Sequence, residues 1–171
     1  MFDSKRRTAM TMAIFVVLIA PVAGAAAERQ TVGYIEDVLL FPGHIPFRAK
    51  IDSGAHTSSL DVADIKEFQR DGKTWVRFQL ATEDGRSLSL ERPVVRIAKI
   101  RRAGTTVEHR PVISLDICLG RHFADAEVNL YDREDMSYRM LIGRRFLGDR
   151  FLIDASAKNL TKPDCPGAPR Q

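Results

Sequence analysis

The sequence has few of the residues on which several common kinds of protein site depend. Its 171 residues include only four histidines and two cysteines. The histidines are scattered at His44, His56, His109 and His122, and none has the His-Glu-x-x-His spacing by which zinc peptidases bind their metal. A phosphate-binding Gly-x-x-x-x-Gly-Lys-Ser/Thr loop is also missing from the sequence. We therefore predict no metal, no nucleotide and no other cofactor.

A strong excess of positive charge is missing as well once the N-terminus is set aside. The full sequence has a net charge of +4, but residues 1–27 carry three basic residues and one acidic residue, which leaves +2 (23 basic minus 21 acidic). Binding to nucleic acid needs a concentrated basic face. We therefore predict that nucleic acid is not a partner.

The N-terminus has the layout of a secretory signal peptide over residues 1–27. Residues 5–7 are basic, residues 8–20 form an uncharged apolar run, and residues 23–27 are small. Cleavage after Ala27 or after Ala25 would leave a periplasmic or secreted protein. A retained membrane anchor is the alternative, although the apolar run is short for a bilayer span of about 20 residues. Only an anchored chain would contact a membrane.

The two cysteines, Cys118 and Cys165, allow one disulfide. Disulfides persist in the compartments to which a signal peptide leads. Cys118 lies in the apolar run of residues 112–119, however, where a buried free thiol is equally ordinary. The sequence leaves both states of the cysteines open.

Most of the sequence after residue 27 reads as short strands, and long helical patterns are scarce. Apolar residues alternate or run together over short stretches that glycine, proline and Asp-Gly pairs separate. The expected strands cover residues 31–40, 47–51, 75–80, 87–90, 94–101, 107–119, 124–131, 140–142 and 151–154. We predict a mainly all-β fold, a small and mostly antiparallel barrel with one short C-terminal helix near residue 144. The domain would cover residues 28–160, and residues 161–171 would form a flexible tail.

One segment has the chemistry that points to a function. The strand of residues 47–51 runs into Asp52-Ser53-Gly54-Ala55, so a carboxylate stands where a strand ends and a loop begins. Gly54 allows close approach of the backbone, and Ser53 offers a hydroxyl. Two such carboxylates that face each other cannot both ionise easily. They share one proton and can activate a water for attack on a peptide carbonyl.

The same residues are also common in simple turns, because Asp, Ser and Gly are frequent turn residues. A second element decides between the two interpretations. Leu141-Ile142-Gly143-Arg144 places two apolar residues before a glycine far along the chain. The pair of motifs is much more specific than either motif alone.

The order of these motifs resembles that of the retropepsin-like aspartic peptidases over residues 33–160. The greatest similarity is to a bacterial family that carries the label "ATP-dependent zinc protease", although this sequence lacks the ligands and the phosphate loop that the label requires. The matching stretches are residues 49–55, 57–60, 75–78, 110–113, 139–144 and 151–154.

The resemblance implies a closed acid-protease barrel that forms half of a homodimer. Asp52 of each subunit would meet its counterpart at a two-fold axis, Ser53 would brace the two loops, and Gly54 would line the substrate channel. The sequence contains a single Asp-Ser/Thr-Gly motif, so a dyad within one chain is excluded. The implied activity is hydrolysis of a peptide or protein substrate by an aspartic endopeptidase.

The resemblance also assigns roles to residues beyond this tripeptide. Ala55 and Thr57 would complete the active-site loop, and Leu141, Ile142, Gly143 and Arg144 would form the second motif. Ala103 and Gly104 would lie at the tip of a flap that closes over substrate. A non-catalytic module that binds peptides or a partner protein through the same groove is the alternative function.

Two departures from the viral enzymes concern this loop. His56 stands where those enzymes have an acidic residue that pairs with the arginine of the second motif, so Arg144 needs another partner. The segment of residues 57–93 is also longer than theirs. Basic residues near the expected flap favour an acidic substrate, or else they form a solvated face. They are Arg96, Lys99, Arg101, Arg102 and Arg110.

Overall fold

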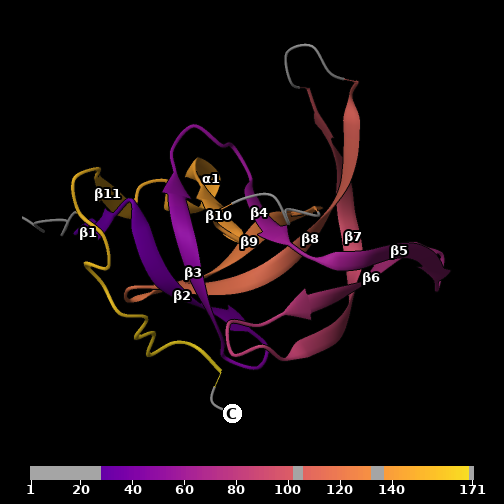
Figure 1. Ribbon diagram of the computed structural model, residues 1–171, viewed down its shortest axis with the longest axis horizontal. Helices are drawn as coiled ribbons and strands as arrows, with labels where there is room; N and C mark the ends of the chain where they lie inside the picture. The colour runs from indigo at the N-terminus through magenta and orange to yellow at the C-terminus, as the bar shows by residue number, and fades with distance from the viewer. Residues whose placement is uncertain (1–27, 102–105, 132–136, 170–171) are drawn as a thin grey trace, which may run out of the picture.

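The computed structural model describes residues 28–101, 106–131 and 137–169 (Figure 1). No helix in these ranges has the length and apolarity needed to cross a membrane. The elements are β1 (Gln30–Gly33), β2 (Ile35–Phe41), β3 (Ile45–Asp52), β4 (Ser58–Asp61), β5 (Ala63–Arg70), β6 (Lys73–Ala81), β7 (Ser87–Ile100), β8 (Glu108–Leu119), β9 (His122–Tyr131), β10 (Met140–Gly143), α1 (Arg144–Leu147) and β11 (Phe151–Asp154). The predicted fold class, mainly β with one short helix near the C-terminus, is confirmed.

Six of the strands close into a barrel. Their order is β2-β3-β10-β4-β9-β8, and β2 pairs with β8 to complete the circle. β10 is parallel to β3 and antiparallel to β4, so a strand from the C-terminal part of the chain is inserted between two strands of the N-terminal part. This insertion brings the two sequence motifs to the same end of the barrel.

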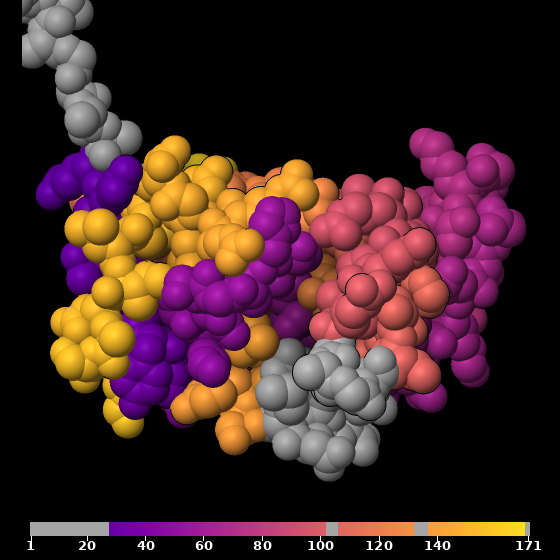
Figure 2. All heavy atoms as spheres, turned by 90° about the horizontal axis from the view of Figure 1, so that it is seen from above, coloured from indigo at the N-terminus to yellow at the C-terminus, as the bar shows by residue number. Residues whose placement is uncertain are grey.

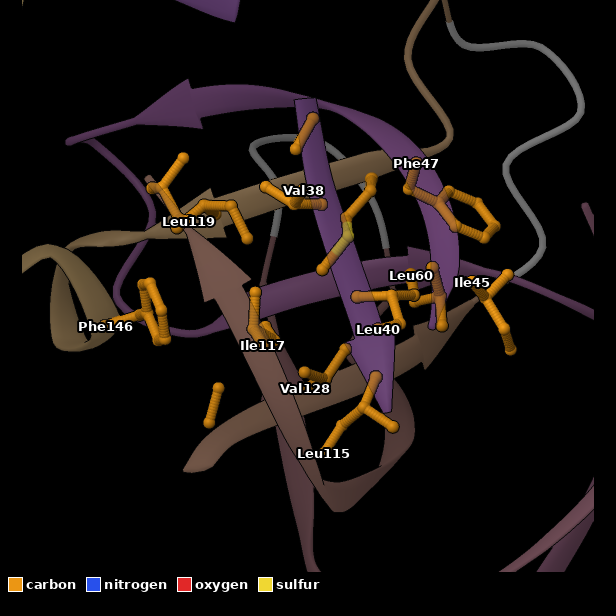
Figure 3. Close-up of a cluster of buried hydrophobic side chains, with 14 of the residues drawn as sticks. Val38, Leu40, Ile45, Phe47, Leu60, Leu115, Ile117, Leu119, Val128 and Phe146 are labelled. Atoms are coloured by element: carbon orange, nitrogen blue, oxygen red, sulfur yellow. The ribbon is translucent and has the colours of Figure 1, made fainter. Parts of the chain in front are cut away.

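The barrel is filled by apolar side chains that the strands turn inward (Figure 3). β3 shows the alternation, because Phe47, Ala49 and Ile51 are buried whereas Arg48 and Lys50 are exposed. Burial of a side chain such as Phe or Ile contributes about 1.5–3 kcal/mol. A slip of one residue would turn the whole buried set outward. The core therefore fixes the register of β3 and the position of the residue that ends it.

Strands β5, β6 and β7 extend the sheet beyond the barrel as an antiparallel arm (Figure 1). β7 belongs to both parts, since residues 87–93 pair with β6 and residues 94–100 pair with β8. The predicted hairpin of residues 75–90 is confirmed. β5 pairs with β6 on its other side and was not predicted. The arm accounts for the extra length of residues 57–93.

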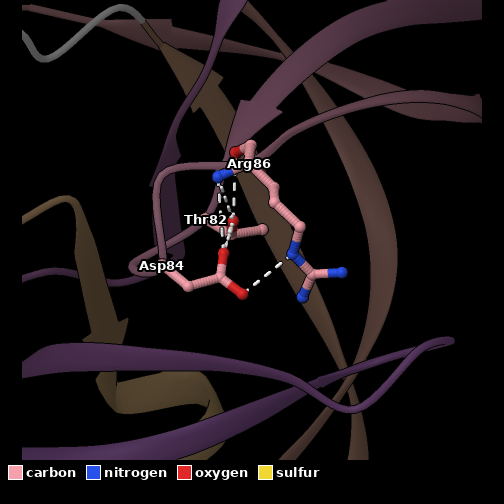
Figure 4. A network of polar contacts seen from close by, with 3 residues as sticks. All are labelled: Thr82, Asp84 and Arg86. Atoms are coloured by element: carbon pink, nitrogen blue, oxygen red, sulfur yellow. Dashed lines mark hydrogen bonds and ion pairs between the residues drawn. The ribbon is translucent and has the colours of Figure 1, made fainter.

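The turn between β6 and β7 is closed by polar side chains (Figure 4). The Thr82 hydroxyl donates to Asp84, and Arg86 Nε donates to Asp84 Oδ2 at 2.8 Å. The hydrogen bond from Thr82, followed by the bonds and charge of Arg86, holds the pKa of Asp84 below its ordinary value, although desolvation opposes the shift. Glu83 accepts a hydrogen bond from the Arg48 N–H at 3.0 Å, which ties this turn to β3.

The C-terminal tail packs against the barrel, so the prediction of a flexible tail is wrong for residues 161–169. Glu36 is fully buried and accepts hydrogen bonds at 2.9 Å from the N–H groups of Leu160 and Thr161 and from the Thr161 hydroxyl. The Gly33 N–H donates to the same carboxylate at 2.6 Å. A buried carboxylate is costly unless it is fully hydrogen-bonded, and here Leu160 and Thr161 supply three of the four donors.

A disulfide between Cys118 and Cys165 fixes the tail at a second point. The Cα atoms of the two cysteines are 6.0 Å apart. The Asp164 N–H donates to the Gly120 carbonyl at 2.7 Å beside the bridge. Of the two states that the sequence left open, the structure has the bridged one. The folded domain therefore extends beyond residue 160.

Candidate active site

Asp52 is half-buried and ends β3 at the rim of the barrel. The neighbouring strand is β10, and the parallel register places Gly143 opposite Asp52. Seen from above, the loop that follows β3 lies at the surface beside the β7–β8 hairpin (Figure 2). The two motifs that the sequence suggested are therefore adjacent in the fold.

The loop after β3 holds the Asp52 carboxylate through its backbone. Oδ1 accepts hydrogen bonds from the N–H groups of Gly54 at 3.0 Å and Ala55 at 3.2 Å. Among the described residues, Oδ2 has no hydrogen-bond partner. One carboxylate oxygen is thus fixed by the loop, and the other is available to a second group.

Gly143 joins the second motif to this loop. Its N–H donates to the Ser58 hydroxyl oxygen at 3.1 Å. A Cβ atom on Gly143 would lie 2.7 Å from the carbonyl carbon of Thr57 and 2.9 Å from the Ser58 nitrogen. Only glycine permits this approach. Ile142 beside it is fully buried in the core, whereas Leu141 on the opposite face is partly exposed.

Arg144 binds the backbone of the loop. It therefore has a partner although position 56 is a histidine and not an acidic residue. Its Nη1 lies 3.3 Å from the Gly54 carbonyl oxygen and 3.5 Å from that of Ser53. The Arg144 N–H donates to the Ala55 carbonyl at 2.9 Å. Carbonyl groups of the loop itself therefore satisfy the arginine of the second motif.

An acidic residue of strand β9, Glu127, binds two arginines that contact the loop. Arg96 Nη2 donates to the Thr57 hydroxyl at 3.1 Å, and its Nε donates to Glu127 Oε2 at 2.8 Å. Arg145 Nη1 reaches the same Glu127 oxygen at 2.9 Å, and the Arg145 N–H donates to the His56 carbonyl at 3.1 Å. Sequence reasoning missed Glu127, because it lies far from the loop along the chain and belongs to no recognisable motif.

A buried network continues from the loop towards the β7–β8 hairpin. Asn129 Nδ2 donates to the Ser58 carbonyl at 2.7 Å, and Arg110 Nη1 donates to Asn129 Oδ1 at 3.3 Å. Arg110 is only 5% exposed, lies over the Tyr131 ring and pairs with Glu108 at 2.6 Å. The prediction that the basic residues form a solvated face is therefore wrong for Arg110.

Two parts of the sequence prediction fall outside the described residues. They are the flap candidates Ala103 and Gly104, with Arg102 beside them, and the leader of residues 1–27. In the part of the chain that the structure describes, no three His, Cys, Asp or Glu side chains come together as ligands for a metal ion.

Comparison with known proteins gives a family match over most of the chain. A family model described as "Retropepsin-like aspartic endopeptidase RimB" matches residues 31–164. The crystal structure of Lpg0085 from Legionella pneumophila, a protein of unknown function, is 30% identical with a TM-score of 0.68, and the match covers 79% of this chain and 100% of that one.

Curated relatives carry a different name. A "Probable alpha-L-glutamate ligase" of Shewanella halifaxensis is 36% identical over 126 residues, which are 71% of this chain and 28% of the relative. A protein of the same name from Desulfotalea psychrophila is 37% identical over 110 residues, or 63% of this chain and 24% of the relative. The chain thus spans about a quarter of the length of these relatives. None of these descriptions uses the zinc-protease label.

Proposed function

Because the chain belongs to the RimB-like family of retropepsin-like aspartic endopeptidases, we propose that it is an exported, homodimeric aspartic endopeptidase. The observation that carries the proposal is the setting of Asp52. The carboxylate ends a buried strand, its Oδ1 is held by two loop N–H groups, and Gly143 of the second motif stands opposite it. This arrangement prepares the free oxygen to meet a second carboxylate.

The dimer follows from the chemistry. The sequence supplies one Asp-Ser-Gly motif, so the second carboxylate must come from another copy. With one proton shared between them, the ionised Asp52 takes a proton from water as the water attacks the peptide carbonyl. The protonated Asp52 gives its proton to the carbonyl oxygen. Such an interface uses the same surface on both subunits.

Exposed apolar side chains support an interface on this surface. On β11, Leu152 is 50% exposed and Ile153 is 38% exposed, and on the β7–β8 hairpin Ile97 is 42% exposed. The Asp52 loop lies between these two elements (Figure 1). Apolar groups on both sides of the loop favour burial against a second subunit.

An acidic polypeptide is the substrate class that we propose. The exposed basic residue Lys99 lies on β7, the exposed Arg101 directly follows that strand, and Arg144 lies beside the loop. The longer relatives are named for a reaction with glutamate. We take that name as support for a substrate with glutamate residues, and ligase activity itself would belong to the rest of those longer chains.

Turnover of unfolded proteins and glutamate-rich peptides by the purified protein tests the proposal. Asp52→Asn should abolish cleavage, whereas Asp37→Asn should leave it unchanged, because Asp37 is a partly exposed residue of β2 that lies 3.7 Å from Arg48 and outside the loop. Equal cleavage by both variants would contradict the role of Asp52. A folded protein that binds these peptides without cleaving them would favour the non-catalytic module.

A further inference from the structure

Glu127 binds two arginines close to the loop that follows Asp52. Its side chain is only 17% exposed, and one oxygen, Oε2, accepts from two arginines of different elements. Arg96 comes from β7, which leads into the expected flap, and Arg145 comes from α1, directly after the second motif. A single carboxylate therefore joins both elements.

Each arginine in turn holds the loop that follows Asp52. Arg96 donates from its Nη2 to the Thr57 hydroxyl at 3.1 Å, and Arg145 donates from its backbone N–H to the His56 carbonyl at 3.1 Å. The Glu127 charge draws both guanidinium groups to one point, because charge-assisted hydrogen bonds are shorter and stronger than neutral ones. Without it, two neighbouring positive charges would repel each other.

We propose that Glu127 is a positioning residue that locks the active-site loop to strand β7. The inference rests on the proposed function for its catalytic consequence. The acidic partner of Arg96 and Arg145 thus comes from β9, and Arg144 keeps its contacts with the loop carbonyls. Arg96 and Thr57 transmit the restraint on one side, and Arg145 transmits it on the other, so that the loop and β7 keep one relative position while substrate enters.

Glu127→Gln tests the proposal, because glutamine keeps the size and loses the charge. We expect kcat to fall about tenfold while KM changes little, since the carboxylate orients the loop and does not touch substrate. Asp125→Asn is the matched control. Asp125 lies two residues earlier on β9, on the same face, and its hydrogen bond is to Ser114 rather than to the loop network. An unchanged kcat in Glu127→Gln, or an equal fall in Asp125→Asn, would overturn the inference.

A double-mutant cycle separates positioning from general stability. In the background of Arg96→Met, the Glu127→Gln change should cost much less activity than it does alone, because the partner is already gone. A cost that is the same in both backgrounds would show that Glu127 does not act through Arg96.

Amide hydrogen exchange decides the question without any assay of turnover. In Glu127→Gln, the amides of residues 53–58 and 94–98 should exchange about tenfold faster, while those of residues 75–80 in the arm should keep their rates. Uniformly faster exchange, or no change in the loop, would contradict a positioning role. If the wild-type protein cleaves nothing, the proposed function fails, and this measurement still decides the role of Glu127.

Discussion

Gly143 approaches the backbone at Thr57 so closely that a Cβ atom would lie 2.7 Å from the Thr57 carbonyl carbon. The contact explains why the second motif needs glycine, and it shows how a residue on β10 controls the loop after β3. The strand order of the barrel creates the contact, because β10 lies between β3 and β4. Substitutions at this point should therefore affect the site before they affect the remainder of the fold.

Gly143→Ala should displace the active-site loop. The new methyl group meets backbone rather than a flexible side chain, so we expect a loss of about 1–3 kcal/mol in the free energy of unfolding, together with loss of activity. Chemical denaturation and the turnover assay measure the two effects. Gly167→Ala is the control, because a Cβ there would meet nothing within 4 Å. Full activity in Gly143→Ala would contradict a close contact between Gly143 and the Thr57 backbone.

Glu36→Gln should loosen the C-terminal tail. Its carboxylate accepts from Gly33, Leu160 and Thr161, and an amide group in its place would present donors to donors. We expect a loss of about 2 kcal/mol in the free energy of unfolding. Glu67→Gln on the exposed strand β5 should cost little. Proteolysis of the tail provides a second measurement, and an unaltered cleavage rate would argue against the anchor.

Loss of the disulfide should lower the free energy of unfolding, because the bridge ties the tail to the fully buried Cys118. Cys118 and Cys165 are separated by 47 residues, and closure of a loop of this size stabilises by about 4 kcal/mol in the chain-entropy model. Cys165→Ser, or treatment with a reductant, should lower Tm accordingly in thermal denaturation. A Tm that a reductant does not change would indicate that the thiols are not bridged in solution.

Asp84 should make the stability depend on acid pH. The fold lowers the pKa of this carboxyl below its ordinary value, chiefly through the Thr82 hydrogen bond and then through Arg86. A lowered pKa stabilises the fold above the ordinary value, and the contribution disappears as pH falls through the folded value. The difference in stability between wild type and Asp84→Asn should thus be larger at pH 6 than at pH 2. Asp71→Asn, in the exposed turn of the arm, is the control in denaturation measurements at both pH values.

Mixing of subunits tests whether two copies share one site. After exchange with an equal amount of Asp52→Asn, only about a quarter of randomly formed dimers carry two intact carboxylates. Activity per total subunit should then fall to about a quarter of the wild-type value, and it should also decline on dilution. Activity that falls only to a half would mean that each subunit acts alone.

Most of the strands and the two motifs were predictable from sequence because their signals are local, but β4 and β5 were missed and the expected strand of residues 31–40 is divided into β1 and β2. The alternation of residues 47–51 and the apolar run before Gly143 each predict a strand from neighbouring residues alone. The structure has strands β3 and β10 at these positions. The tail was not predictable, since its polar residues are anchored by Glu36 and Cys118, which lie far away along the chain. Glu127 escaped prediction for the same reason. A partly buried carboxylate that pairs with a distant arginine leaves no periodic pattern in the sequence.

Strand β7 is shared by the arm and the barrel. Residues up to Pro93 pair with β6, and residues from Val94 onward pair with β8. The second part of this strand also reaches the loop after Asp52, because Arg96 donates a hydrogen bond to the Thr57 hydroxyl. One continuous strand therefore joins the arm to the candidate active site, so a change in the twist of the arm would be felt at Arg96.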